Sequence, residues 1–164
     1  MKRLSLILVA VVVLAEAAAC GGKDEVATGL EAQLQGTWAS PCELVTGGSA
    51  KGTSAFSGLR YTWAVLSYTN GTCTGTGTVI PIGAGSTVIG STVTANLGPT
   101  PVTAYQVDYT PDSKPGVVYY DLGYVDSTVS PNRFYMGDTL GGNLGTTAAM
   151  RPTALDATYW YVKQ

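Results

Sequence analysis

The stretch Gly36-Thr37-Trp38-Ala39-Ser40-Pro41-Cys42 decides how this chain folds. It places a large aromatic residue two positions after a glycine, and it opens a long series of short segments rich in Thr, Val, Ile and Tyr. Residues two apart on a strand lie on the same face. Gly36 and Trp38 therefore share one face, and this face is predicted to turn toward a core. We interpret this stretch as the first strand of a small antiparallel β-barrel.

Turn-forming residues divide the rest of the chain into strand-like segments. We expect strands at residues 36–40, 50–57, 60–68, 74–82, 87–95, 102–109, 117–125, 133–136 and 157–162. Ser57-Gly58 and Asn70-Gly71 predict tight hairpins, and the Pro- and Gly-containing segment 111–116 predicts a turn. The glycine-rich segment 139–147 predicts a loop.

Two of these segments alternate in period two, which is typical of a sheet with one buried face. In the first, the apolar side is formed by Thr103, Tyr105, Val107 and Tyr109. In the second, it is formed by Val118, Tyr120, Leu122 and Tyr124, and Asp121 is expected on the opposite, polar side. A sandwich is the alternative to a barrel, but sequential hairpins favour an all-β, antiparallel, up-and-down β-barrel of eight to nine strands, which leaves no exposed edge.

The first residues have the pattern of an export signal. Lys2 and Arg3 precede an apolar run at 4–14, which is shorter than the roughly 20 residues that a spanning helix needs, and Ala17-Ala18-Ala19 leads directly to Cys20. This end resembles the bacterial lipobox, with Ala17 where leucine is usual, which implies cleavage before Cys20 and a lipid on its sulfur. The alternative is an ordinary signal peptide cut after Ala19.

The expected organisation follows from this signal. Residues 1–19 are expected to form a lipoprotein signal peptide, 20–35 a lipidated tether with a short helical turn that places Leu30 and Leu34 on one face, and 36–164 the barrel domain. The alternative for the Leu30–Leu34 segment is a loose tether. Lipidation of Cys20 places the protein at the bacterial cell envelope with the membrane as a partner. Gly21 in place of aspartate after the cysteine favours the outer membrane.

Two cysteines remain once Cys20 carries the lipid. Cys42 and Cys73 form an even pair in an exported, oxidising compartment, which predicts one disulfide. A metal site on these two thiols is disfavoured because the chain has no histidine and no second cysteine pair.

Composition argues against several functional classes. Only 12 % of residues are charged and no basic patch occurs, so nucleic acid is not expected as a partner. Without histidine there is no Ser-His-Asp or Cys-His arrangement, and we expect neither an enzyme nor a cofactor. The aspartates that could act as acid and base are instead expected in solvent, at turns or on polar faces: Asp108, Asp112, Asp121, Asp126, Asp138 and Asp156.

The Gly-x-Trp of the first strand, after a short helical turn, resembles the lipocalins. In that family the tryptophan closes one barrel end and packs on a basic residue from late in the chain. The resemblance implies closure by Gly36, Trp38 and Arg151, with Lys163 as the second choice of basic residue.

The chain resembles more closely a group of uncharacterised bacterial lipoproteins. They share a Gly-x-Trp, a cysteine soon after it, a second cysteine after a tyrosine-rich strand, and an Arg-Pro-x-x-Leu-Asp segment before an aromatic strand. The corresponding stretches here are 151–156 and Tyr159-Trp160-Tyr161.

Aromatic residues are the remaining indication of function, because rings with polar tips suit the wall of a pocket. Seven are candidates to line a cavity: Tyr61, Trp63, Tyr105, Tyr109, Tyr120, Tyr124 and Trp160. The alternative is that they only fill the core. Three functions stay open: a barrel that binds a small apolar or amphipathic ligand, a periplasmic interaction protein such as a protease or lysozyme inhibitor, and a structural component of the envelope.

Overall fold

The computed structural model describes residues 29–140 and 143–164. The predicted signal peptide, Cys20 and the first part of the tether lie outside these residues. The elements, in chain order, are α1 (Gly29–Leu34), β1 (Gly36–Ala39), β2 (Glu43–Val45), β3 (Gly48–Ser57), β4 (Arg60–Tyr68), β5 (Thr78–Leu97), β6 (Thr100–Pro111), β7 (Tyr119–Asp126), β8 (Arg133–Met136), the 3-10 helix η1 (Ala148–Met150), β9 (Ala154–Leu155) and β10 (Tyr161–Lys163).

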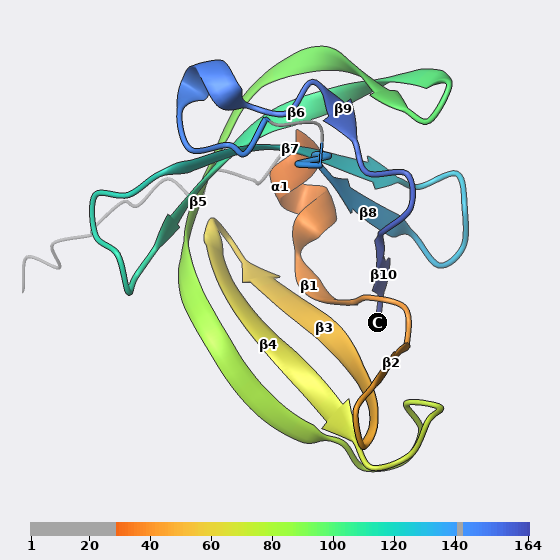
Figure 1. Cartoon of the computed structure of the whole chain (residues 1–164). Coiled ribbons are helices and arrows are strands. Elements are labelled where there is room, and N and C mark those ends of the chain that lie inside the picture. The colour runs from red at the N-terminus through yellow and green to blue at the C-terminus, as the bar shows by residue number, and fades with distance from the viewer. Residues whose placement is uncertain (1–28, 141–142) are drawn as a thin grey trace, which may run out of the picture.

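Eight of the strands close into a barrel (Figure 1). From β3 to β8 each strand pairs antiparallel with the next, β10 pairs with β8, and β1 closes the circle by pairing with both β10 and β3. Two strands stand outside the circle, because β2 extends the sheet beside β3 and β9 pairs parallel with β5. The predicted up-and-down, lipocalin-like barrel is confirmed.

Most predicted strands are present, and β4 and β8 have the predicted bounds. The expected strands 74–82 and 87–95 are wrong as separate elements, because one continuous strand of 20 residues, β5, runs from residue 78 to residue 97 and includes most of both. The glycines between them are not turn residues. A Cβ atom on Gly85 would lie 2.4 Å from the carbonyl oxygen of Thr110 and 2.6 Å from the Tyr61 hydroxyl, so this glycine permits close approach inside the sheet.

The turns follow local chemistry only in part. Gly58-Leu59 and Gly98-Pro99 make two-residue hairpins, with both glycines at positive φ. The tight hairpin predicted at Asn70-Gly71 is wrong, since residues 69–77 form a longer loop between β4 and β5. Asn70 instead folds this loop through its side chain, which accepts a hydrogen bond from the Thr72 backbone N–H at 2.9 Å.

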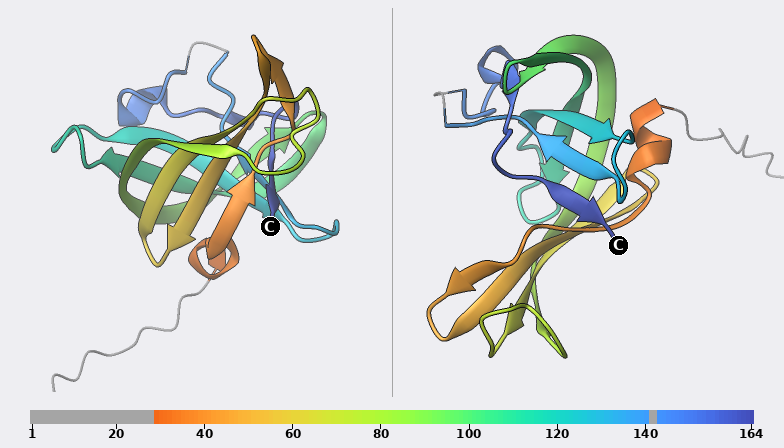
Figure 2. Two further views of the ribbon diagram at one scale, coloured as in Figure 1. Left: turned by 90° about the horizontal axis from the view of Figure 1, so that it is seen from below. Right: turned by 90° about the vertical axis from the view of Figure 1, so that its right-hand side faces the viewer.

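The sheet extends beyond the barrel on one side. The tip of β2, β3 and β4 and the loop before β5 project from the body of the molecule, as Figure 2 shows. We call this part the arm. The predicted Cys42–Cys73 disulfide is present and joins the start of β2 to the loop that follows β4, with Cα atoms 5.8 Å apart.

The core lies inside the barrel, and helix α1 contributes to it. Leu30 and Leu34 are buried there together with Trp38, Val107 and Phe134. The helical turn considered from the Leu30–Leu34 spacing is therefore part of the core.

The predicted orientation of β7 is wrong. Asp121 lies opposite Val107 and faces the interior, whereas Leu122 packs in a second cluster on the outer face with Tyr124 beside it. The segment that carries β9 covers this outer face through Leu155. Because both faces of β7 are covered, apolar alternation alone does not show which face is inside.

Candidate functional site: a cavity inside the barrel

Trp38 closes the barrel interior at the side of α1. The side chain is fully buried, its indole Nε1 donates a hydrogen bond to the Leu34 carbonyl at 2.7 Å, and its ring centroid lies 5.8 Å from that of Phe134. The cation over this ring is Lys163, whose Nζ lies 5.3 Å from the centroid. This position follows from the pairing of β1 with β10, in which Trp38 and Lys163 are directly opposite.

Arg151, the first candidate for this role, lies elsewhere, so that prediction is wrong. Its guanidinium lies over the ring of Tyr120 at 5.3 Å and donates hydrogen bonds to the carbonyl oxygens of Asp121 at 2.6 Å and Val107 at 3.3 Å. It also forms an ion pair with the carboxylate of Asp108 at 2.7 Å. Arg151 thus fixes the segment after η1 against the outer face of β6 and β7.

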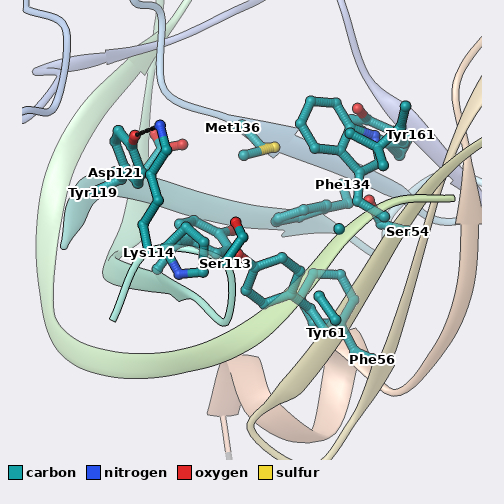
Figure 3. A pocket seen from close by; sticks show the side chains of 16 residues that line it. Ser54, Phe56, Tyr61, Ser113, Lys114, Tyr119, Asp121, Phe134, Met136 and Tyr161 are labelled. Carbon is teal, nitrogen blue, oxygen red and sulfur yellow. Dashed lines mark hydrogen bonds between the residues drawn. The ribbon is translucent and has the colours of Figure 1, made fainter. Parts of the chain in front are cut away.

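A cavity of about 500 Å³ occupies part of the barrel interior (Figure 3). Phe134 lines it and also contacts Trp38, so this ring separates the closed side from the cavity. The lining residues are Ser54, Phe56, Tyr61, Trp63, Ile82, Gly83, Ala84, Tyr109, Pro111, Ser113, Lys114, Tyr119, Asp121, Phe134, Met136 and Tyr161.

Three of the seven predicted aromatic residues line this cavity, namely Tyr61, Trp63 and Tyr109. The other four do not. Tyr105 packs against the barrel core, Tyr120 lies under Arg151, and Tyr124 and Trp160 pack against the outer cluster.

Sequence reasoning missed several cavity residues. Phe56 and Phe134 carry no polar tip and gave no signal beyond that of ordinary core residues. Asp121 was predicted on the wrong face of β7, and Tyr119, two residues before it, shares its face.

Asp121 is the carboxylate of the cavity lining, which contradicts its predicted place in solvent. Its Oδ1 accepts hydrogen bonds from the backbone N–H groups of Leu122 at 2.7 Å and Gly137 at 2.9 Å. A Cβ atom on residue 137 would lie 2.4 Å from that oxygen, so glycine is what allows this contact. Burial raises the pKa of Asp121 to about 6, and the two backbone hydrogen bonds and the charge of Arg151 oppose the rise.

Tyrosine hydroxyls supply the remaining polar atoms. The hydroxyl of Tyr109 is buried without a hydrogen-bond partner in the described part of the chain, and burial raises the pKa of this phenol well above its usual value. The ring of Tyr61 stands nearly perpendicular to it at 5.5 Å. Near Tyr119, Lys114 Nζ donates to the phenolic oxygen at 3.4 Å.

The free energy of unfolding should fall as pH rises, because Asp121 loses its proton. Its folded-state pKa of about 6 lies above its ordinary value of 3.8, so folding favours the protonated form. The associated stability is fully present below about pH 4 and is lost as pH rises through about 6, by at most roughly 3 kcal/mol. Asp121→Asn should remove this dependence.

Urea denaturation at about pH 4 and pH 7.5 tests this linkage. Asp126→Asn is the matched control, because Asp126 lies on the same strand one residue beyond the buried Val125 and accepts its hydrogen bonds from Thr128. Equal pH dependence in wild type and Asp121→Asn would show that Asp121 titrates as an ordinary surface carboxyl.

Known proteins do not identify the site. Comparisons with protein-family models, with curated proteins and with solved structures each find no match for this chain. Among residues 29–140 and 143–164, no helix has the length and apolarity needed to cross a membrane, and no three metal-ligating side chains gather. The cavity is therefore the feature on which a functional argument rests.

Proposed function

We propose that this chain is a lipid-anchored envelope protein whose barrel binds a small, mostly apolar or amphipathic ligand. The cavity is the observation that carries the proposal. Its volume of about 500 Å³ lies within the range of roughly 300–1,000 Å³ that is usual for small-molecule sites. Its walls combine the rings of Phe56, Trp63 and Phe134 with a few polar groups, which is the usual composition of such sites.

A cavity in the barrel supports ligand binding over a purely structural role. An eight-stranded barrel has an interior that side chains can fill completely or that can hold one small ligand. Here the core clusters around Trp38, and part of the interior is left open. A purely structural barrel has no need of this space.

Binding of a neutral apolar fluorophore, N-phenyl-1-naphthylamine, tests the cavity function. The domain without Cys20, purified from a periplasm, should give saturable binding of one probe per chain. Ser54→Phe places a ring in the cavity and should weaken binding by about tenfold or more, because a filled site excludes the probe.

Ser57→Phe is the matched control, since it makes the same substitution three residues later, at an exposed position. It should leave probe affinity unchanged, and circular dichroism should show both variants folded. Wild-type protein that does not bind the probe, or a Ser54→Phe variant that binds it as well as wild type, would contradict the proposal.

The lipid anchor is tested independently of the cavity. The lipobox-like sequence at 17–20 supports the proposal that Cys20 is acylated and holds the protein at the outer membrane. Wild type should then enter the detergent phase of a phase-separation extraction, and Cys20→Ala should remain in the aqueous phase. Wild type in the aqueous phase would refute the anchor.

A second function, as an interaction protein, is supported by exposed apolar side chains on the arm and on the adjoining start of β5. Leu44 of β2 and Val79 of β5 are 78 % and 63 % exposed, and Ile80 of β5 is also exposed. Apolar side chains left in solvent are surfaces that a protein partner can bury. Binding of a partner through Leu44 and Val79 would not respond to Ser54→Phe, so the two functions are separable.

A further inference from the structure

The carboxylate of Asp121 lacks a counter-ion inside the cavity wall. Its Oδ1 holds two backbone N–H groups, whereas its Oδ2 accepts no hydrogen bond from any residue in the described ranges. The ion pairs of those ranges are Arg60 with Asp112 and Arg151 with Asp108, so Asp121 belongs to neither.

The nearest guanidinium does not neutralise this charge. Arg151 lies on the outer face and donates to the backbone carbonyl of Asp121, while its direct ionic partner is Asp108. No cation of the described residues lies within ion-pair distance of the Asp121 carboxylate, which faces the interior. Its Oδ1 is hydrogen-bonded to two backbone N–H groups, so Oδ2 is the oxygen left to pair with a positive charge.

The neighbourhood of Asp121 offers hydrogen-bond acceptors but little positive charge. On β6 its direct partner is Val107, and Tyr109 lies two residues further along the same face. The Tyr109 hydroxyl has no hydrogen-bond partner among the described residues, and the charge of Asp121 adds to the rise in the pKa of this phenol that burial causes. Tyr119 of β7 and Tyr61 of β4 line the same cavity, as does Tyr161 of β10. Lys114, in the connection from β6 to β7, is the cation of this cavity lining, and its Nζ donates a hydrogen bond to the Tyr119 hydroxyl.

The geometry points to an amphipathic amine as the ligand of this cavity, with its ammonium group on Asp121 Oδ2 and its apolar body between Phe56, Trp63 and Met136. This inference rests on the proposed function and names its ligand class. An ammonium group supplies both the missing charge and the hydrogen-bond donors that the Asp121 oxygen can accept. The apolar walls on the other side of the cavity hold the hydrocarbon part.

The pKa of Asp121 supports this assignment. A carboxyl whose pKa burial has raised to about 6 is only partly stabilised as an anion by its surroundings. A cation bound beside it favours the ionised form, so binding of an ammonium group should cause Asp121 to release its proton to solvent. Amine affinity is then expected to fall as pH is lowered through the pKa of this carboxyl.

Three ligands that share a ten-carbon chain and differ in the head group test the inference: decylamine, decanol and decanoate. Each is titrated against the probe-loaded domain at about pH 7.5, where the amine is a cation. A charge-assisted hydrogen bond contributes about 1.5–3 kcal/mol. The dissociation constant of decylamine, obtained from displacement of the probe, should therefore be roughly ten- to hundredfold lower than that of decanol. Decanoate should bind most weakly.

The Asp121→Asn variant isolates the head-group contact. Asparagine keeps an acceptor for Leu122 and Gly137 and removes the charge, so the preference for decylamine over decanol should disappear while decanol still binds. Asp126→Asn, which removes a carboxylate of the same strand outside the cavity lining, should keep the full preference. Lowering the pH to about 4.5 should reduce the preference in wild type, because Asp121 is then protonated.

The outcomes separate this inference from the proposed function. If none of the three ligands displaces the probe, the cavity does not take aliphatic amphiphiles and the amine inference falls with that result. If decanol binds as tightly as decylamine in wild type, or if Asp121→Asn retains the amine preference, the cavity function stands and the amine inference is overturned.

Discussion

Replacing Trp38 with alanine should lower the free energy of unfolding by about 3–5 kcal/mol, because removal of a large buried ring leaves a cavity in the core. Trp38 is fully buried, contacts Phe134, and donates its indole N–H to the Leu34 carbonyl. The loss would be a large fraction of the roughly 5–15 kcal/mol that stabilises a typical domain. Urea denaturation of the purified domain measures it.

A double-mutant cycle identifies the basic partner of this ring. Lys163→Ala should have a smaller effect, near the roughly 0.5–2 kcal/mol of a cation–π contact. Its effect should not add to that of Trp38→Ala, since residues in contact couple. Arg151→Ala is the control, and because Arg151 lies over Tyr120, its effect should add to that of Trp38→Ala. Additivity with Lys163→Ala would mean that the lysine does not interact with the ring.

Removing the disulfide should be the next largest effect. The Cys42→Ala/Cys73→Ala variant loses a cross-link between residues separated by 31 positions, which the loop-entropy argument values at about 3–4 kcal/mol. Reduction of wild-type protein should produce the same loss, because both treatments release the same loop. Denaturant melting under reducing and non-reducing conditions compares them.

The position of the disulfide refines this expectation. It joins two segments of the arm, where Ser49 is buried and donates to the Asn70 carbonyl while it accepts from the Cys73 backbone N–H. Hydrogen exchange of the arm and of the β6–β7 region should therefore be compared in the variant. A loss below about 1 kcal/mol, the level of an ordinary substitution, would mean that strand pairing alone holds the arm.

The barrel was predictable because strand-like segments separated by turn residues recur after Gly36, and two of them alternate in period two. The first strand, the helical turn at Leu30 and Leu34 and the Cys42–Cys73 pair were all predictable from local signals. The single long strand β5 was not predictable, because a glycine such as Gly85 is typical of a turn. Here Gly85 is instead required by its close contact with the Thr110 backbone.

The candidate site was less predictable, because it depends on which face of each strand turns inward. Leu122 and Tyr124 are apolar enough for a core, and they do pack in one, but on the outside of the barrel under the segment of β9. The position of Asp121 followed from that inversion. In the same way, the choice of Lys163 over Arg151 depends on the register between β1 and β10, which joins distant parts of the chain.

The seam between β1 and β10 also has a consequence for how the protein must mature. β1 is the first of the ten strands to emerge during synthesis and β10 is the last, and both are short, with four and three residues. Until β10 arrives, the side of β1 away from β3 is an open edge that offers unpaired backbone groups to other chains. Because β10 covers this edge, a chain that folds only after β10 is available should expose the edge less to other chains.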